Sequence, residues 1–157
     1  MRKPVAAHEF LEALFEAEVS GRGTRRVRTA LRLSNLPTGQ TLANFDFAFQ
    51  PAIERSRIET LATCAWVRNA ETVLIQGTPG VGKTHLAIAL GIKAVEQGFS
   101  VQYFRFDELL NEMRSELLAS YEVLTTAFLD RLLHKAHALN IKGRSYRLRD
   151  LEQAASM

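Results

Sequence analysis

The chain of 157 residues has room for one domain with one hydrophobic core, and its 46% hydrophobic and 24% charged residues exclude the fibrous and disordered classes. No apolar run reaches the roughly 18 residues that a membrane span requires, and the charged start of the chain does not lead into a signal sequence. We therefore expect a cytoplasmic protein with no membrane partner. Cys64 is the one cysteine, which excludes an intrachain disulfide and favours a buried thiol.

The net charge of +3 conceals two basic segments that contain no acid. The first spans residues 22–32, and its arginines are Arg22, Arg25, Arg26, Arg28 and Arg32. The second spans residues 131–149 and carries six Lys or Arg. Two such segments are typical of a protein that binds a polyanion, although either one alone is equally consistent with a solvated helical face.

The N-terminal part of the chain has a helical pattern. Apolar residues at helical spacing predict an amphipathic helix over the first twenty residues, loosened at Gly21 and Gly23 and resuming over residues 22–33. The turn-rich stretch 35–39 predicts a boundary between a helical region, residues 1–36, and a second region, residues 37–157. Beyond it, the alternation of Phe45, Phe47 and Phe49 predicts an extended segment with three rings on one side.

The second region has the pattern of an α/β fold. A helix from Pro51 to about Val67 is predicted to precede a strand at 72–76, and a helix from Lys83 to Gly98 to precede a strand at 101–106. The two strands and the helix between them form a strand, helix, strand unit with a right-handed crossover. Asp107 is predicted to cap the next helix, a last helix is predicted at 122–139, and the tail 141–148 is predicted as a small hairpin or extended arm.

A phosphate-binding pattern lies between the first predicted strand and the helix that follows it. The loop reads Gly77, Thr78, Pro79, Gly80, Val81, Gly82, Lys83 and Thr84. Glycine allows consecutive backbone amides to point at a polyphosphate, the Lys83 ammonium attracts the β and γ oxygens, and the Thr84 hydroxyl can bind magnesium. The loop therefore predicts ATP and Mg²⁺ as ligands, against the alternative of a glycine-rich turn with an incidental lysine.

Hydrolysis of ATP needs further acidic residues, one to hold magnesium and one to orient the attacking water. Asp107 and Glu108 resemble such a pair, but Arg105 interrupts the apolar run before them and both acids coincide with a helix start. We expect them to cap that helix. The sequence thus predicts nucleotide binding and leaves catalytic residues unassigned.

With the loop placed, longer stretches of the chain become informative: Thr41 to Phe47, Gly77 to Ile92, Phe128 to His134 and Tyr146 to Arg149. They resemble the IstB-like ATP-binding proteins, the transposition helpers of bacterial insertion sequences, related to the DnaC helicase loaders among the AAA+ ATPases. The resemblance implies a P-loop NTPase fold and a protein that binds double-stranded DNA, assembles with itself and acts on a cognate transposase. It also implies that the arginine-rich N-terminal region contacts DNA and that Arg131 matches a sensor arginine facing the nucleotide.

One departure from the family lies between about Arg114 and Glu122. There the sequence passes directly to the family's C-terminal helix, as if the acidic strand, the sensor strand and the arginine finger were deleted. The remaining parallel sheet is reduced, so its two strands must pair directly or stay poorly ordered, and we expect marginal stability. Two alternatives stay open: a DNA- or partner-binding module in which the loop is a relic, and a non-functional remnant of a mobile element.

Other side chains allow two interpretations. His134 and His137 have a spacing that could suit a metal, but no further ligand accompanies them, so surface or nucleic-acid contact is favoured. The three phenylalanines of residues 45–49 could border the adenine, as the family position suggests, although core packing alone explains them.

Overall fold

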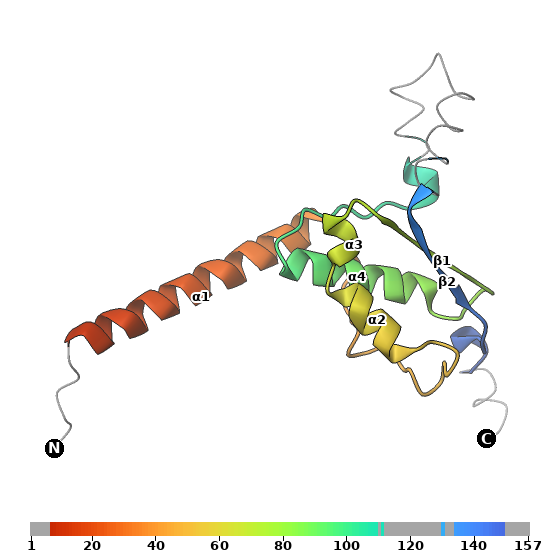
Figure 1. The fold of residues 1–157 in the computed structure, drawn as a ribbon, viewed down its shortest axis with the longest axis horizontal. Helices are drawn as coiled ribbons and strands as arrows, with labels where there is room; N and C mark the ends of the chain where they lie inside the picture. Colours follow the sequence, from red (N-terminus) through yellow and green to blue (C-terminus); the bar gives the residue numbers. More distant parts are fainter. Residues whose placement is uncertain (1–6, 110, 112–129, 131–133, 150–157) are drawn as a thin grey trace, which may run out of the picture.

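The computed structural model describes residues 7–109, 111, 130 and 134–149. Its elements are, in chain order, α1 (Ala7–Leu33), α2 (Arg55–Ala62), α3 (Ala65–Arg68), β1 (Thr72–Gly77), α4 (Lys83–Glu96) and β2 (Ala136–Ile141). Figure 1 shows that α1 extends away from the other elements, which gather around α4 and the two strands. Among the described residues, no helix is long and apolar enough to cross a membrane. The fold is therefore mixed helix and strand with a small parallel sheet, as the sequence predicts.

The helix α1 is continuous, so the prediction that glycines interrupt it is wrong. Gly21 and Gly23 both keep negative φ angles within the helix. Glycine costs only about 0.5–1 kcal/mol relative to alanine in a helix, and an ion pair between Arg22 and Glu18 at 2.8 Å supports the same turns. The second half of α1 packs against the end of α4, where Val27 and Ala30 line a shared crevice.

The segment that carries the three phenylalanines turns instead of extending. Asp46 Oδ1 accepts a hydrogen bond from the Phe49 amide at 3.0 Å, and the Phe47 amide donates to the Phe45 carbonyl at 3.1 Å. A side-chain acceptor of this kind stabilises a turn, which overrides the alternation of the rings. Phe45 is buried in the core, whereas Phe47 and Phe49 are half-buried.

The helix predicted from Pro51 begins later and is broken. It starts at Arg55, and Cys64, with a φ of 56°, separates α2 from α3. Cys64 is fully buried, as predicted, and burial raises the pKa of its thiol. Trp66 Nε1 donates to the Leu61 carbonyl at 2.9 Å and ties the two short helices together.

The strand β1 confirms the prediction at 72–76, but its neighbour is not the predicted one. It pairs in parallel with β2, from Thr72 opposite Ala136 to Gly77 opposite Ile141. The end of the predicted last helix is therefore a strand. Leu139 and Ile141 are both buried, and residues two apart lie on the same face of a strand. The rest of that helix, at 122–129 and 131–133, lies outside the described residues.

The predicted strand at 101–106 is absent from the structure. Residues 101–105 pair with no strand among the described residues, and the Tyr103 amide donates instead to the Ser34 carbonyl at 2.8 Å. The helix that begins at Phe106 is capped by Glu108, whose carboxylate accepts from the Arg105 amide at 3.3 Å, and not by Asp107. The predicted crossover between the two strands is wrong for the same reason.

The tail forms no hairpin at Gly143. Residues 142–145 are irregular, and residues 146–149 are helical. The helix α4 ends as predicted, with Gly98 at a φ of 89° two residues after it.

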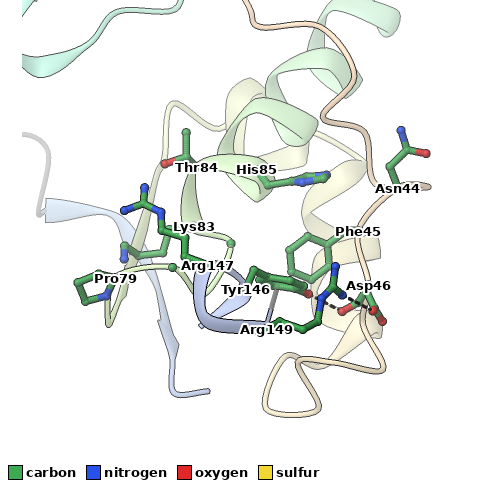
Figure 2. Close-up of a pocket in the computed structure, with 12 residues that line it drawn as sticks. Asn44, Phe45, Asp46, Pro79, Lys83, Thr84, His85, Tyr146, Arg147 and Arg149 are labelled. Atoms are coloured by element: carbon green, nitrogen blue, oxygen red, sulfur yellow. Dashed lines mark hydrogen bonds and ion pairs between the residues drawn. The ribbon is translucent and has the colours of Figure 1, made fainter. Parts of the chain in front are cut away.

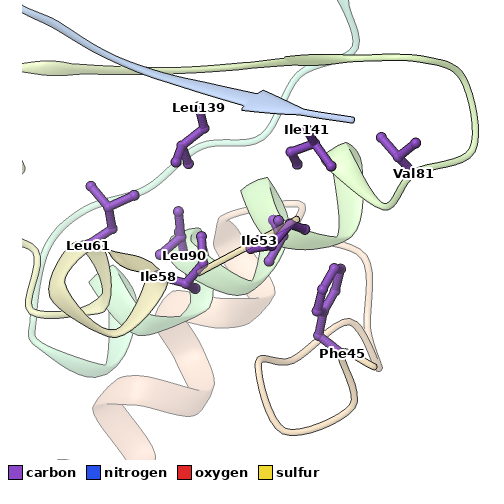
Figure 3. Packing of buried hydrophobic residues seen from close by; sticks show 9 residues of the cluster. Phe45, Ile53, Ile58, Leu61, Val81, Leu90, Leu139 and Ile141 are labelled. Atoms are coloured by element: carbon purple, nitrogen blue, oxygen red, sulfur yellow. The ribbon is translucent and has the colours of Figure 1, made fainter. Parts of the chain in front are cut away.

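One core joins the strands to the helices. Its buried residues are Phe45, Ile53, Ile58, Leu61, Val81, Leu86, Leu90, Leu139 and Ile141. Figure 3 shows Leu139 and Ile141 facing Ile58 and Leu61 of α2 and Leu90 of α4. Since Val81 lies inside the phosphate loop, the core itself fixes the position of the loop.

Candidate functional site

The phosphate loop connects the end of β1 to the start of α4 and depends on glycine. Gly77, Gly80 and Gly82 have φ angles of 149°, 82° and 92°, in the region that favours glycine. A Cβ on Gly82 would lie 2.7 Å from a ring carbon of Phe45. The loop can therefore pack closely against this ring only because glycine has no side chain.

The inner side of the loop offers hydrogen-bond donors. The Gly80, Val81 and Gly82 amides donate to no other described residue, and α4 begins directly after them. The Lys83 ammonium donates to the Gly77 carbonyl at 2.9 Å and to the Thr78 carbonyl at 2.7 Å, which folds it over the loop. Free amides, a lysine and a helix N-terminus together form a binding site for an anion.

The segment after β2 packs on the back of this loop. The Tyr146 amide donates to the Gly80 carbonyl at 2.9 Å, and a Cβ on Gly80 would collide with the Ser145 hydroxyl. A Cβ on Gly77 would likewise collide with the Ile141 carbonyl. The loop is therefore held from two sides, by the core through Val81 and by residues 141–146.

A cavity of about 630 Å³ opens beside the loop, within the range of ligand sites in proteins. Pro79, Lys83 and Thr84 line it from the loop and α4, and Arg147 lines it from the C-terminal segment. Figure 2 shows Arg147 on the same side of the cavity as Lys83 and Thr84. Among the described residues Arg147 has no hydrogen-bond or ion-pair partner, so two cationic side chains face the space next to the loop.

Aromatic rings form the other wall. Phe45 contacts His85 and Tyr146 edge to face, with ring centroids 5.3 and 6.0 Å apart. His85 Nε2 lies 2.8 Å from the Thr41 carbonyl, and the Tyr146 hydroxyl donates to the Asp46 carbonyl at 2.6 Å. Burial raises the pKa of Tyr146, and the Asp46 carboxylate raises it further, so the hydroxyl stays a donor. Figure 2 shows His85 and Phe45 away from Pro79, across the cavity.

Two more contacts join this wall to the C-terminal segment. Arg149 forms an ion pair with Asp46 at 3.4 Å and lies over the rings of Phe49 and Tyr146. The fully buried Gln50 donates through Nε2 to the Arg144 carbonyl. Residues 142–149 therefore connect the phosphate loop to the aromatic wall.

The arginines of the first basic segment lie on α1, far from this cavity in sequence. All five are exposed, and Arg22 is paired with Glu18. Arg25, Arg28 and Arg32 repeat at helical spacing on one side of the helix. The helix thus presents a basic stripe on a different face from the one that packs on α4.

The structure assigns other candidate residues to places outside the cavity. Asp107 and Glu108 stand at a helix start, where they bond to Arg105. His137 bonds to Glu71 at 2.6 Å, and no three His, Cys, Asp or Glu side chains among the described residues gather closely enough to hold a metal. Arg131, the predicted sensor arginine, lies outside the described residues.

Sequence reasoning missed the residues that the C-terminal segment brings to the cavity. Tyr146 and Arg147 reach it because β2 runs parallel to β1, so both strands end at the same edge. The signal available in the sequence was the basic run after Ile141, which we interpreted as part of a polyanion-binding segment. His85 was also missed, although it directly follows the loop pattern.

Comparisons with known proteins identify a family that the chain matches. The family model of the IstB-like ATP binding protein matches residues 2–117 and 115–154 in two segments that meet at 115–117. A Pseudomonas aeruginosa protein, described as an ATP-binding protein of insertion sequence IS21, is 34% identical over 215 residues, covering 98% of this chain and 81% of that protein. A Geobacillus stearothermophilus protein, described as an ATP-binding protein of insertion sequence IS5376, is 29% identical over 208 residues, covering 93% and 83%.

Both aligned regions are longer than the 157 residues of this chain, so the relatives contain internal residues that it lacks. The junction of the two matched segments lies where the sequence indicates a deletion, between about Arg114 and Glu122. The match on both sides of the junction includes the phosphate loop and β2. This chain is a shortened member of the family of IstB-like ATP binding proteins.

Proposed function

We propose that the chain binds ATP with magnesium in the cavity beside the phosphate loop. The observation that carries the proposal is the loop itself, whose amides at Gly80 to Gly82 donate to no described residue while the Lys83 ammonium bonds to the Gly77 and Thr78 carbonyls of the same loop. The relatives described as ATP-binding proteins support the choice of nucleotide.

The residues present fit both parts of the ligand. The loop amides and the start of α4 would hold the phosphates, and Lys83 would exchange its two carbonyl acceptors for phosphate oxygens. The exposed Thr84 hydroxyl has no partner among the described residues and is a suitable magnesium ligand. Magnesium would neutralise phosphate charge there. Arg147, on the same side of the cavity, would contact the terminal phosphate from the C-terminal segment.

We further propose that the chain hydrolyses ATP poorly. Among the described residues that line the cavity, Asp46 is the one carboxylate, and it is engaged by Arg149. Figure 2 shows Asp46 across the cavity from Thr84, next to Arg149 and Tyr146. Phosphoryl transfer needs an acid that holds the metal and a residue that orients water.

The proposed biological role is that of a DNA-binding helper in transposition. Residues 1–36 would form the DNA-binding arm, through Arg22, Arg25, Arg26, Arg28 and Arg32, and residues 37–157 the nucleotide-binding unit. The exposure of the five arginines supports contact with double-stranded DNA phosphates, and the relatives from insertion sequences support a role in transposition. A cognate transposase as partner and self-assembly on DNA are further parts of this proposal.

The test measures nucleotide affinity and steady-state turnover in the same purified protein, with Lys83→Ala as the control. We expect saturable ATP binding that the control loses, together with turnover far below that of a full-length relative. Turnover equal to that of the relative would refute the loss of hydrolysis. DNA affinity that neither ATP nor Lys83→Ala changes would favour the nucleotide-independent module instead.

A further inference from the structure

His85 holds a fixed position on the wall of the nucleotide cavity. It is the third residue of α4, directly after Lys83 and Thr84, and its ring is half-buried against Phe45. Its Nε2 atom lies 2.8 Å from the Thr41 carbonyl oxygen. Position and contact together orient the ring toward the same cavity that the phosphate loop lines.

The contact with Thr41 also fixes which ring nitrogen carries the hydrogen. A carbonyl oxygen only accepts hydrogen bonds, so Nε2 must be the donor. In a neutral imidazole the other nitrogen, Nδ1, is then an acceptor. Nδ1 has no hydrogen-bond partner among the described residues, so His85 keeps one acceptor free on the ring that lines the cavity.

An acceptor distinguishes between purine bases. Adenine carries an amino group at position 6, which donates hydrogen bonds, whereas guanine carries a carbonyl oxygen there, which only accepts. With the phosphates in the loop, the wall of His85 and Phe45, which lines the same cavity and which Figure 2 shows away from Pro79, is where the base would lie. We propose that His85 is a specificity residue that accepts a hydrogen bond from the 6-amino group and so selects adenine over 6-oxo purines.

This inference rests on the proposed nucleotide binding, and its test isolates the amino group. Affinities of the full-length chain are measured for Mg²⁺-ATP and for the magnesium complex of purine riboside triphosphate, which lacks that group. We expect ATP to bind about 2- to 10-fold more tightly, the range for one hydrogen bond. Equal affinities for the two nucleotides would overturn the proposal without any variant.

The substitution His85→Gln sharpens the test, because the glutamine amide can still donate to Thr41 but places no acceptor at the Nδ1 position. The affinity ratio should fall to about 1 through weaker ATP binding alone. His137→Gln, the same change on β2 outside the cavity, should leave the ratio as in the unmodified chain. A His85→Gln protein that keeps the full ratio would contradict the assignment.

The outcomes separate this inference from the proposed function. If both nucleotides bind, and bind equally, only the role of His85 fails. If neither nucleotide binds to the unmodified chain, or if Lys83→Ala leaves both affinities unchanged, the proposed phosphate site fails and the assignment of His85 fails with it.

Discussion

At the scale of single residues, the site depends on positions where a side chain is missing. Gly80 has a φ of 82° and packs directly against Ser145 of the C-terminal segment. No space remains there for a Cβ atom. Gly98 has a similar φ of 89° but no heavy atom within 4 Å of a Cβ. Comparing alanine substitutions at the two positions therefore separates the free-energy cost of backbone strain from the cost of steric crowding.

Gly80→Ala should therefore destabilise the protein more than Gly98→Ala. We expect about 1–2 kcal/mol from the left-handed backbone in both variants, and a further loss in Gly80→Ala from the contact with Ser145. Urea unfolding followed by circular dichroism measures both. Equal losses in the two variants would show that the C-terminal segment does not pack on the loop.

Glu71 makes the stability depend on pH. The hydrogen bond from His137 lowers the pKa of the Glu71 carboxyl in the folded protein. A lowered folded pKa means that this contribution is present above the unfolded pKa and is lost as the pH falls through the folded pKa. Stability should thus decline in acid, below the ordinary range of a glutamate. Glu71→Gln should flatten this part of a pH series of urea melts, and an unchanged slope would contradict the assignment.

Residue patterns made the phosphate loop predictable, and they also predicted the buried Cys64. These features depend on a few neighbouring residues whose conformations are local. The contacts of Arg147 and His85 with the cavity could not be predicted in the same way, because they depend on which distant segments pack together.

At the scale of elements, local helices were predicted better than strand pairing. The helix α4 and the strand β1 lie where their apolar patterns place them. Residues 101–106 are mostly apolar, as a buried strand would be, yet a strand needs a neighbour for its backbone hydrogen bonds, and this segment pairs with no strand in the described part of the chain. The partner of β1 is β2, about 60 residues further along the chain, which no local pattern specifies.

The basic stripe on α1 gives a prediction for DNA binding. Replacing Arg25, Arg28 and Arg32 by alanine should weaken binding to duplex DNA of any sequence. It should also reduce the slope of log affinity against log salt by up to about 3, since each phosphate contact contributes about 0.9. Fluorescence anisotropy over a salt series measures the slope. Arg55→Ala on α2, which removes a cation paired with Glu59, is the control and should leave the slope nearly unchanged. An unchanged slope in the triple variant would place the DNA contact elsewhere.

At the scale of the whole molecule, the described sheet has only two strands, and the relatives contain residues that this chain lacks. A two-stranded sheet is stable only when other elements cover it, and here α2, α4 and the loop at Phe45 supply the cover. Ile141 is central, because it lies in the core and its carbonyl contacts the phosphate loop at Gly77. The core and the phosphate loop are therefore connected through β2.

Ile141→Ala should cost about 2–5 kcal/mol, the range for a buried isoleucine, which is a large part of the stability of a small domain. We expect loss of a cooperative urea transition, or a midpoint far below that of the unmodified chain. Leu148→Ala, at a side chain that is 55% exposed, is the matched control and should cost less than about 1 kcal/mol. A small effect of Ile141→Ala would show that β2 is not needed for the fold.

Nucleotide binding at the phosphate loop is tested most directly by calorimetric titration of Mg²⁺-ATP into the full-length chain, once circular dichroism has shown that the chain is folded. Lys83→Ala removes charge-assisted bonds worth roughly 1.5–3 kcal/mol each, so it should weaken binding by about tenfold or more. We expect saturable heat from one site in the unmodified chain and a large loss of affinity in the variant. Absence of heat at millimolar Mg²⁺-ATP, from folded protein, would contradict it.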